Sequence, residues 1–356
     1  MPKKSKCIKI AKIYGEKAII LAKKLKIFNG ELEIQRNKNV IYIPLIHQPS
    51  ADELKTLKKQ IPDCKISTHD FPEKKKQVKT FVEMLQDTLS PHLLANLPRS
   101  IDLVGDIAII EIPPELDAHK HAIGEAVLET HKNVRTVLAK KGAISGTYRL
   151  REFSVIAGEP KTETIHKEHG CQYYLDVAKA YFSPRLSYEH KRVASLVKQG
   201  ETIVDLFAGV GPFVIQIAKT HENVQVYAID VNPDAVEFLK RSIRLNRVEG
   251  KVHPILGDAK QVVEEKLSGV ADRVIMNLPE KAMEFVEAAC KALKPDGGIV
   301  HFYSFVSASV SLETVKLCFL KAVEKCGRKA ERIFFSRFVR ATAPYEWQVV
   351  LDAEIH

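Results

Sequence analysis

The stretch Val204–Phe213 reads VDLFAGVGPF, and it decides the fold of the chain. An apolar strand pattern ends at Asp205, and Gly209 and Gly211 follow directly before a helix pattern. Glycines in such a turn let the backbone approach a ligand closely, and the first amides of the helix then face that ligand. The spacing is not G-x-G-x-x-G, and no Gly-Lys-Ser or Gly-Lys-Thr follows, so this is not a P-loop. The stretch predicts a βα unit with a ligand site at the carboxyl end of its strand.

Outward from this stretch, apolar strands alternate with amphipathic helices over residues 173–356. The strand segments are ETIVDLFAG, VQVYAID, KVHPILGD, DRVIMNLP, GGIVHFYSF, RIFFSRFVRA and EWQVVLDAEI. Helical segments GPFVIQIAKTH, DAVEFLKRSIRLN and MEFVEAACKALK lie between the early strands. Repeated βα units predict an α/β fold with a mostly parallel seven-stranded sheet and helices on both faces. The short connection ATAPY predicts that the last two strands form an antiparallel pair.

The chain before this sheet is long enough for two small α+β domains. Residues 1–68 contain a helix-like and a strand-like segment and are predicted to form the first. Residues 69–80 are polar and lysine-rich and begin near a proline, which is typical of a linker. Residues 81–172 alternate helix and strand patterns and are predicted to form the second. The remaining residues, 173–356, form the domain with the parallel sheet.

The composition narrows the class of partner. The chain has 356 residues, a formal net charge of +10 and a pI of about 9.1, which favours a polyanion such as RNA. A basic protein without a nucleic-acid partner is the alternative. No run of eighteen apolar residues is present, so no membrane partner is expected, and we expect a cytoplasmic protein. The six cysteines are scattered without a CxxC pair, so neither a metal site nor a disulfide framework is expected.

Polar residues end the successive strands of the sheet. Asp230 follows the second strand, where a carboxylate typically accepts hydrogen bonds from a ribose diol. Asp258 follows the third strand and can reach an adenine amino group. Each aspartate alone is more often a helix N-cap, but three strand ends with Asp, counting Asp205, together predict an adenosyl pocket. The fourth strand ends in Asn277-Leu278-Pro279, a rigid polar loop that faces the reactive part of such a ligand.

These segments resemble a known family. The constellation is similar to the class I S-adenosylmethionine-dependent methyltransferases, with their Rossmann-like seven-stranded sheet. HKEHG, FSPR with Glu189 four residues after Arg185, DLFAGVGPF, AIDVNP and RVIMNLP together resemble the archaeal and eukaryotic tRNA (guanine-N1)-methyltransferases that act at position 37. The resemblance covers residues 80–356, and residues 1–68 match the family's small tRNA-binding domain more loosely. It implies S-adenosylmethionine as cofactor and the tRNA anticodon loop and body as partner, and we expect a monomer.

The resemblance also implies catalytic roles. Guanine N1 carries a proton, and its removal places negative charge on O6, so the reaction needs a base near N1 and a donor near O6. The family's base corresponds to Glu189 and its O6-stabilising arginine to Arg149, with Arg151 as the fallback, because both lie on one predicted strand. Asn277 would hold the guanine, and Pro279 would fix the loop. The implied cofactor-binding residues are Tyr181, Arg185, Asp205, Phe207, Gly209, Gly211, Asp230, Asp258 and Asn277.

One position departs from the family pattern. An Arg often follows the catalytic Glu, whereas His190 follows it here, so Lys191 or Arg192 is expected to supply a phosphate contact. Lys140 and Lys141 are expected to contact phosphates as well. Other aromatic residues are candidates either for stacking on an extruded base or for core packing; they are Tyr148, Tyr181 and Tyr188.

Three alternatives to guanine N1-methylation stay open at this point. A wyosine-pathway aminocarboxypropyl transferase would use the same cofactor at the same tRNA position. A dual-specificity methyltransferase would also act on a wyosine precursor. A non-catalytic RNA-binding protein with a relic cofactor pocket belongs to a different class, and it would bind the cofactor poorly.

Overall fold

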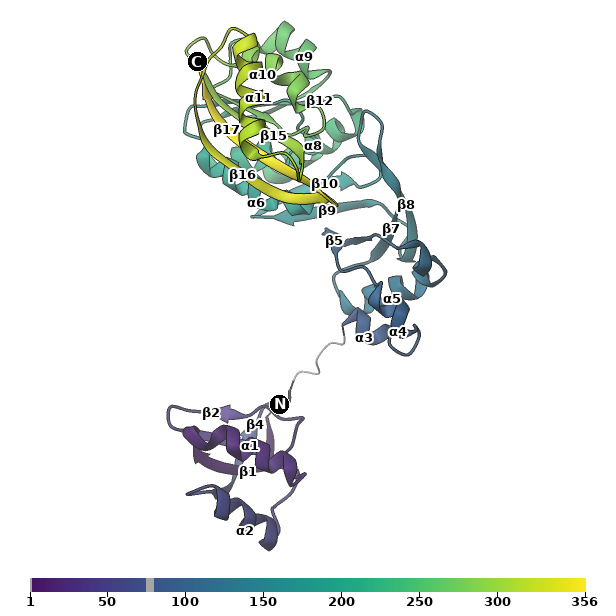
Figure 1. Ribbon diagram of the computed structural model, residues 1–356, viewed down its shortest axis with the longest axis vertical. Coiled ribbons are helices and arrows are strands. Elements are labelled where there is room, and N and C mark those ends of the chain that lie inside the picture. The colour runs from purple at the N-terminus through teal and green to yellow at the C-terminus, as the bar shows by residue number, and fades with distance from the viewer. Residues whose placement is uncertain (1, 75–79) are drawn as a thin grey trace. The chain divides into compact units, whose positions relative to one another are not determined.

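The computed structural model describes residues 2–74 and 80–356. The chain divides into two compact units, Met1–Val78 and Lys79–His356 (Figure 1). The first unit has one sheet and the second has three, and each unit has its own apolar core. Among the described residues, no helix combines the length and the apolar character that crossing a membrane requires.

The first unit is a four-stranded antiparallel sheet with two helices, and its strand order is β2-β3-β1-β4. Its core consists of alternate strand residues such as Ile8 and Ile43, with Leu57 from a helix. A capping box starts the second helix, because Ser50 Oγ accepts from the Glu53 amide and the Glu53 carboxylate accepts from the Ser50 amide. The elements are β1 (Lys3–Ala11), α1 (Gly15–Lys24), β2 (Gln35–Arg36), β3 (Val40–Pro44), α2 (Ala51–Gln60) and β4 (Lys65–Phe71).

The predicted linker begins too early. Residues 69–71 belong to β4, which pairs with β1 as far as Phe71 opposite Lys3. Phe71 is buried and His69 stacks on Tyr42 with ring centroids 4.2 Å apart, so this polar-looking segment contributes to the sheet and its packing. The part of the predicted linker at residues 75–79 lies outside the described residues.

The second unit begins with a smaller four-stranded sheet of order β5-β6-β7-β8. Only the β6–β7 pair is parallel, and α5 lies between these two strands in the sequence. Helix residues such as Ile123 and Val127 pack against Ile110 and Val137 of the strands. The elements are α3 (Phe81–Leu85), α4 (Pro91–Ala95), β5 (Ile101–Val104), β6 (Ile107–Ile110), α5 (Lys120–Thr130), β7 (Thr136–Ser145) and β8 (Leu150–Gly158).

An antiparallel hairpin follows, formed by β9 (Glu163–Glu168) and β10 (Cys171–Asp176). Its buried residues Tyr173 and Leu175 belong to the core of the large sheet that follows in the sequence. The Tyr174 amide donates to Ser242 Oγ of a helix in that domain at 2.9 Å. The predicted domain boundary at 172/173 therefore falls inside β10, because the hairpin packs with the large sheet's domain before its first strand begins.

The large sheet has seven strands in the order β13-β12-β11-β14-β15-β17-β16. The first five strands in sequence run parallel, and β17 is antiparallel to both β15 and β16, which confirms the predicted α/β sheet and its terminal antiparallel pair. The strands are β11 (Thr202–Asp205), β12 (Gln225–Asp230), β13 (Val252–Leu256), β14 (Arg273–Met276), β15 (Gly298–Ser307), β16 (Ala330–Ala343) and β17 (Glu346–Ile355).

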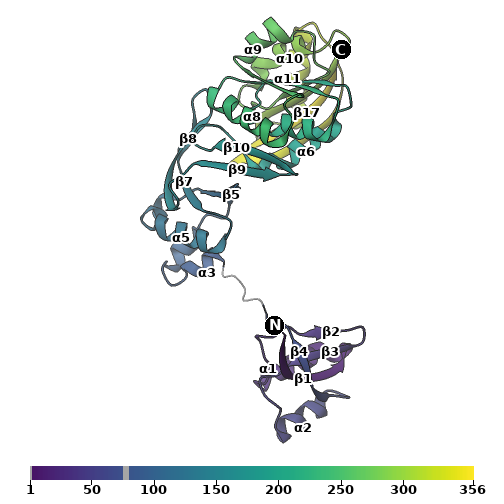
Figure 2. The same ribbon diagram turned by 180° about the vertical axis from the view of Figure 1, so that it is seen from behind.

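Helices cover both faces of this sheet (Figures 1 and 2). Successive strand residues serve opposite faces, so Ile203 packs with residues of α6, α7 and α8, while Val204 packs with residues of α9, α10 and α11. This two-sided burial explains why the strands read as continuous apolar runs. The helices are α6 (Ser187–Leu196), α7 (Pro212–Thr220), α8 (Pro233–Asn246), α9 (Ala259–Val262), α10 (Val286–Ala292) and α11 (Leu312–Lys325). The short 3-10 or π segments are η1 (Lys12–Tyr14), η2 (Pro114–His119), η3 (Pro184–Leu186), η4 (Val263–Leu267) and η5 (Ala282–Phe285).

Candidate active site

A cavity of about 370 Å³ lies at the carboxyl ends of the parallel strands. The loops after four strands contribute to it, as expected where the strand order reverses in an open α/β sheet. Six residues predicted to bind a cofactor line it, together with the predicted catalytic residue Arg149. These six are Tyr181, Phe207, Gly209, Asp230, Asp258 and Asn277.

Asp230 joins the glycine loop to the end of β12. One of its carboxylate oxygens accepts from the Gly209 amide at 2.7 Å, and the other accepts from the Asn232 amide at 2.9 Å. Burial raises the pKa of the Asp230 carboxyl, and these amide hydrogen bonds lower it by less. Each oxygen keeps a lone pair. The arrangement therefore fits the diol of a ribose, which offers two hydroxyl donors.

Asp258 also has a structural role. It is the N-cap of α9, and its Oδ1 accepts from the amides of Lys260 and Gln261 at 2.9 and 3.3 Å. The N-cap of α8 is Asn232, not Asp230. Of the two aspartates that follow β12 and β13, only Asp258 is therefore a helix cap. Its second carboxylate oxygen remains available at the cavity wall.

Three of the predicted cofactor-binding residues do not line this cavity. Arg185 forms an ion pair with Asp102 of β5 at 2.6 Å, which directs it to the junction with the smaller sheet. Asp205 is fully buried below the loop, where Oδ1 accepts from the Phe207 amide at 3.1 Å. Gly211 packs against α8, because a Cβ there would lie 2.4 Å from Leu239. These three residues were predicted to contact the cofactor, but none of them lines the first cavity.

The loop after β14 is held at both ends. Asn277 lines the cavity, and its Oδ1 accepts from Gln348 Nε2 at 3.1 Å. Pro279 is buried and lies outside this cavity's lining, and its carbonyl accepts from the Phe305 amide at 3.2 Å. Pro279 thus anchors the loop to β15, while Asn277 presents its side chain to the cavity.

A second cavity of about 280 Å³ adjoins the first. Both cavities share Arg149, Tyr181 and Glu280 in their walls. The second also contains Arg151, the fallback arginine, and Arg340 of β16. Two molecules bound side by side would therefore meet at Arg149 and Tyr181.

Arg149 lies in the turn between β7 and β8, and not on a strand as predicted. Its φ is +56°, and its amide donates to the Gly146 carbonyl at 3.1 Å. Strand alternation would have allowed only one of Arg149 and Arg151 to face a given side. Because Arg149 is in a turn, this limit does not apply, and both arginines line the second cavity. The Arg149 guanidinium lies 4.8 Å from the ring centre of Tyr181 and 3.2 Å from a Glu280 oxygen. Its buried Nε has no hydrogen-bond partner among the described residues.

Glu189 is in the first turn of α6 and is 1% exposed. Its carboxylate accepts from Arg192 at 2.9 Å, from the Tyr303 hydroxyl at 2.8 Å and from Arg337 at 2.7 Å. Neither cavity includes Glu189 in its lining. The predicted base is therefore held by three donors, from α6, β15 and β16, and lies outside the lining of both cavities.

His190 and Arg192, which follow Glu189 on α6, are each paired with a carboxylate. His190 Nδ1 donates to a Glu168 carboxylate oxygen at 2.6 Å. Burial raises the pKa of the Glu168 carboxyl, but His166 and His190 lower it to about 2. Arg192 forms an ion pair with Asp352 at 2.5 Å and is 10% exposed at its side chain. The phosphate contact predicted for Arg192 does not fit this environment, whereas Lys191 is exposed.

The remaining candidates divide by exposure. Tyr148 is 43% exposed and lines the first cavity, and Tyr188 is 61% exposed with the Arg337 guanidinium 4.5 Å from its ring centre. Neither is a core residue, so both remain candidates for stacking. Lys140 lies 3.5 Å from Glu111, while Lys141 is exposed.

Some lining residues carry no recognisable signal in the sequence. Phe285 comes from the segment before α10 and packs edge-on against Phe207. Lys260 Nζ lies 4.7 Å from the ring centre of Phe285. Arg340 and Gln348 come from β16 and β17, more than sixty residues after the loop that they support. A pattern of alternating strand residues places them on a sheet but does not indicate which loop they contact.

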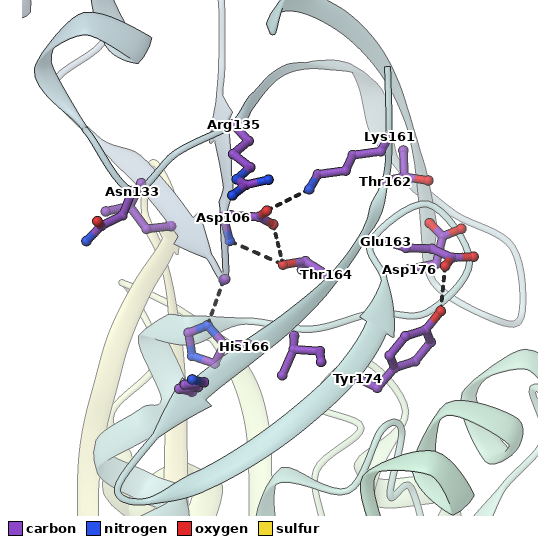
Figure 3. A pocket seen from close by; sticks show the side chains of 14 residues that line it. Asp106, Asn133, Arg135, Lys161, Thr162, Glu163, Thr164, His166, Tyr174 and Asp176 are labelled. Atoms are coloured by element: carbon purple, nitrogen blue, oxygen red, sulfur yellow. Dashed lines mark hydrogen bonds and ion pairs between the residues drawn. The ribbon is translucent and has the colours of Figure 1, made fainter. Parts of the chain in front are cut away.

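A further hollow of about 1150 Å³ is structural (Figure 3). It lies where the hairpin meets the smaller sheet, and its polar side chains bond to one another. Asp106 accepts from Lys161 at 2.6 Å and from Thr164 at 2.7 Å, and the Gly105 amide donates to His166 at 3.1 Å. These internal bonds join two parts of the second unit, so we assign no ligand to this hollow.

Known proteins share this architecture and sequence. Residues 164–331 match the family described as TRM5/TYW2 methyltransferase domain, residues 81–162 the TYW2 N-terminal domain, and residues 7–53 the tRNA methyltransferase 5 N-terminal domain. The chain is 45% identical over 263 residues to tRNA (guanine(37)-N(1))-methyltransferase Trm5b of Pyrococcus abyssi, covering 73% of this chain and 76% of the relative. It is 34% identical to the Trm5b of Methanocaldococcus jannaschii over 98% of both chains.

Solved structures and a second group of relatives complete the comparison. The complex of aTrm5 and tRNALeu matches 98% of this chain and 99% of that chain, with a TM-score of 0.74 and 33% identity. A Pyrococcus horikoshii tRNA(Phe) (4-demethylwyosine(37)-C(7)) aminocarboxypropyltransferase is 33% identical and covers 77% of this chain and 95% of the relative. Of these three relatives, the Pyrococcus abyssi methyltransferase has the highest sequence identity, and the Methanocaldococcus methyltransferase also aligns over the first unit. The chain belongs to the tRNA (guanine-37-N1)-methyltransferase family of S-adenosylmethionine-dependent enzymes.

Proposed function

We propose that the chain methylates N1 of guanosine 37 in tRNA, with S-adenosylmethionine as methyl donor. The observation that carries this proposal is the pair of adjoining cavities that share Arg149 and Tyr181. The first has the strand-end residues of an adenosyl site, and the second has room and arginine donors for an extruded base. The family relatives named for this reaction support the same assignment.

The first cavity fits the cofactor. Gly209 has a φ of +54°, and a Cβ there would meet only the Tyr181 carbonyl oxygen, at 3.8 Å, so the backbone at the cavity wall can lie close to a bound molecule. Asp230 is placed to accept from the ribose diol, and Phe207 and Phe285 offer apolar ring surface to the adenine. S-adenosylmethionine, when bound, supplies an electrophilic methyl group.

Arg149 is the proposed donor to guanine O6. Loss of the N1 proton moves negative charge to O6, and a buried guanidinium stabilises that charge more than it stabilises the neutral base. The unpartnered Nε of Arg149 is consistent with a site that a ligand completes. Its stacking on Tyr181 holds the guanidinium plane between the two cavities.

Glu189 is the proposed general base. Its carboxylate would take the N1 proton while N1 gains the methyl group and the methyl–sulfur bond of the donor breaks, which would leave N1-methylguanosine, S-adenosylhomocysteine and a protonated Glu189. To reach N1, the side chain has to leave Arg337 and turn toward the second cavity. Arg337 is 35% exposed at its side chain, so binding of the RNA beside Tyr188 is the step that we expect to draw it away.

The test is methyl transfer from labelled S-adenosylmethionine to an unmodified tRNA transcript with guanosine at position 37, beside a transcript with adenosine there. We expect N1-methylguanosine in the first transcript alone, located by mass spectrometry. Glu189→Gln should lower kcat by about 100-fold or more, because general-base catalysis contributes about that factor. Glu237→Gln, at a half-exposed ion pair on α8, is the matched control and should keep the native rate.

Other products would change the assignment. An aminocarboxypropyl adduct, or methylation of only a pre-modified tRNA, would assign the chain to the wyosine branch of the family. A native rate in Glu189→Gln would remove Glu189 from the mechanism and leave the reaction in place. We also propose that the enzyme acts as a monomer in the cytoplasm, which sizing chromatography with and without tRNA and cell fractionation would test.

A further inference from the structure

A chain of hydrogen bonds connects the last two strands of the sheet to Asn277. Arg340 of β16 donates from Nε to Gln348 Oε1 of β17 at 2.9 Å, and Gln348 Nε2 donates to Asn277 Oδ1 at 3.1 Å. Gln348 is 1% exposed and lines neither cavity. Any effect of Gln348 on bound molecules must therefore pass through Asn277 or Arg340.

The direction of this chain follows from the chemistry of Arg340. A guanidinium group has only N–H donors, so the Gln348 atom that it contacts must be the carbonyl oxygen. The amide nitrogen of Gln348 then has to face Asn277, and Asn277 has to meet it with its own carbonyl oxygen. This reasoning does not depend on how either amide was oriented. The Asn277 amide nitrogen, with its two donors, is left for the cavity.

Arg340 also fixes two other parts of the site. Its NH1 donates to Ser183 Oγ at 2.8 Å, and its NH2 donates to the Tyr181 hydroxyl at 3.2 Å. Ser183 and Tyr181 belong to the segment before α6, while Arg340 itself lines the second cavity. One side chain thus holds the shared wall of both cavities and sets the orientation of Asn277 through Gln348.

We propose that Arg340 and Gln348 are positioning residues for methyl transfer, which present Asn277 to the target base as a hydrogen-bond donor. This inference rests on the proposed function, since it concerns the orientation of the base during that reaction. Atoms such as O6 of guanine accept a hydrogen bond from such a donor, whereas the N6 amino group of adenine does not. The polarity imposed by Arg340 therefore favours a guanine-type edge at Asn277.

Two substitutions of Gln348 separate loss of the contact from reversal of its polarity. Gln348→Met removes both hydrogen bonds and leaves the Asn277 amide free to turn. Gln348→Glu keeps the contact to Arg340, and its second carboxylate oxygen attracts the Asn277 amide nitrogen, so the Asn277 carbonyl turns to the cavity. We expect kcat on the guanosine-37 transcript to fall by about tenfold in Gln348→Met and further in Gln348→Glu.

The controls distinguish positioning from folding. The affinity for S-adenosylmethionine, measured by calorimetry, should change by less than about threefold in both variants, because Asp230 and the glycine loop are untouched. Gln216→Met replaces another buried glutamine, on α7 and outside both cavities, and should keep the native kcat. A kcat within about twofold of native in both Gln348 variants would overturn the proposal. A higher kcat in Gln348→Glu than in Gln348→Met would show that the Asn277 amide nitrogen is not the group that has to face the base.

The outcome is independent of the proposed function's own test. If the native enzyme forms no N1-methylguanosine, the proposed function fails before any variant is compared. If the native enzyme is active and the Gln348 variants match it, only the positioning role fails.

Discussion

Asp205 illustrates how burial sets the charge of a single side chain. It is fully buried at the end of β11, where Oδ1 accepts from the Phe207 amide and Oδ2 has no partner among the described residues. Burial raises the pKa of its carboxyl to about 7, and the neighbouring charge of Asp230 also raises it. In the unfolded chain an Asp has a pKa of about 3.9. Between these values the folded state binds a proton that the unfolded state has lost.

We predict that Asp205 makes the protein less stable as pH rises from about 4 to about 7. Where the folded state binds more protons, the free energy of unfolding falls by up to about 1.4 kcal/mol per pH unit for one group. Asp205→Asn removes this titration, so its stability relative to native should rise with pH. Urea unfolding at pH 5, 6 and 7 measures the difference. Asp234→Asn, at an exposed residue of α8, is the control. The prediction would be contradicted if the difference in free energy of unfolding between the native protein and Asp205→Asn did not change with pH.

At the scale of an element, the start of α7 depends on two glycines for different reasons. Both have a positive φ, +54° at Gly209 and +91° at Gly211. A Cβ at Gly211 would lie 2.4 Å from Leu239 of α8, so this residue lets two helices pack. A Cβ at Gly209 would meet only the Tyr181 carbonyl, at 3.8 Å, beside the first cavity.

We predict that alanine at these two positions has separable effects. Gly211→Ala should lower the free energy of unfolding by about 2 kcal/mol or more, because overpacking adds to the strain of a positive φ. Gly209→Ala should cost about 1 kcal/mol and mainly weaken S-adenosylmethionine binding, since the methyl group enters the cavity. Thermal unfolding and calorimetry measure the two effects. Equal stability of the two variants, or native cofactor affinity in Gly209→Ala, would contradict the assignment.

At the scale of the whole molecule, the chain consists of two units with separate cores. Both cavities are lined entirely by residues of the second unit. The first unit carries many exposed lysines, including Lys3, Lys4 and Lys9, which suit phosphate contacts. The aminocarboxypropyltransferase of Pyrococcus horikoshii aligns over 95% of its own length but over only 77% of this chain. The broader family therefore includes a shorter chain.

We predict that residues 80–356 alone bind S-adenosylmethionine with native affinity but bind tRNA less tightly. Each lysine–phosphate contact that is lost should reduce the slope of log K against log salt by about one. Calorimetry of the cofactor and tRNA titrations at several salt concentrations test both parts. A native tRNA affinity with a native salt slope would show that the first unit makes no phosphate contact.

Much of this architecture was predictable from local patterns. Apolar runs and helix periodicity predicted the strands and their order along the chain, and the short last connection predicted the terminal antiparallel pair. These patterns depend only on residues that are near one another in the chain. The polar residues at strand ends, such as Asp230 and Asn277, also followed from local sequence, since parallel strands bring their carboxyl ends to one edge. Gly209 was predicted as a point of close approach to a ligand for the same local reason, and it lines the first cavity.

Only the tertiary structure decided which of these residues face a cavity. Arg185 pairs with Asp102, Gly211 packs against Leu239, and Glu189 lies among donors from β15 and β16, so each has a partner distant in sequence. The role of Gln348 beside Asn277 likewise depends on β17 entering the sheet between β15 and β16. Sequence by itself determined the elements and the class of chemistry, because these depend on local backbone preferences and residue types. The contacts that orient the chemistry depend on how distant segments pack, and the folded structure alone establishes that packing.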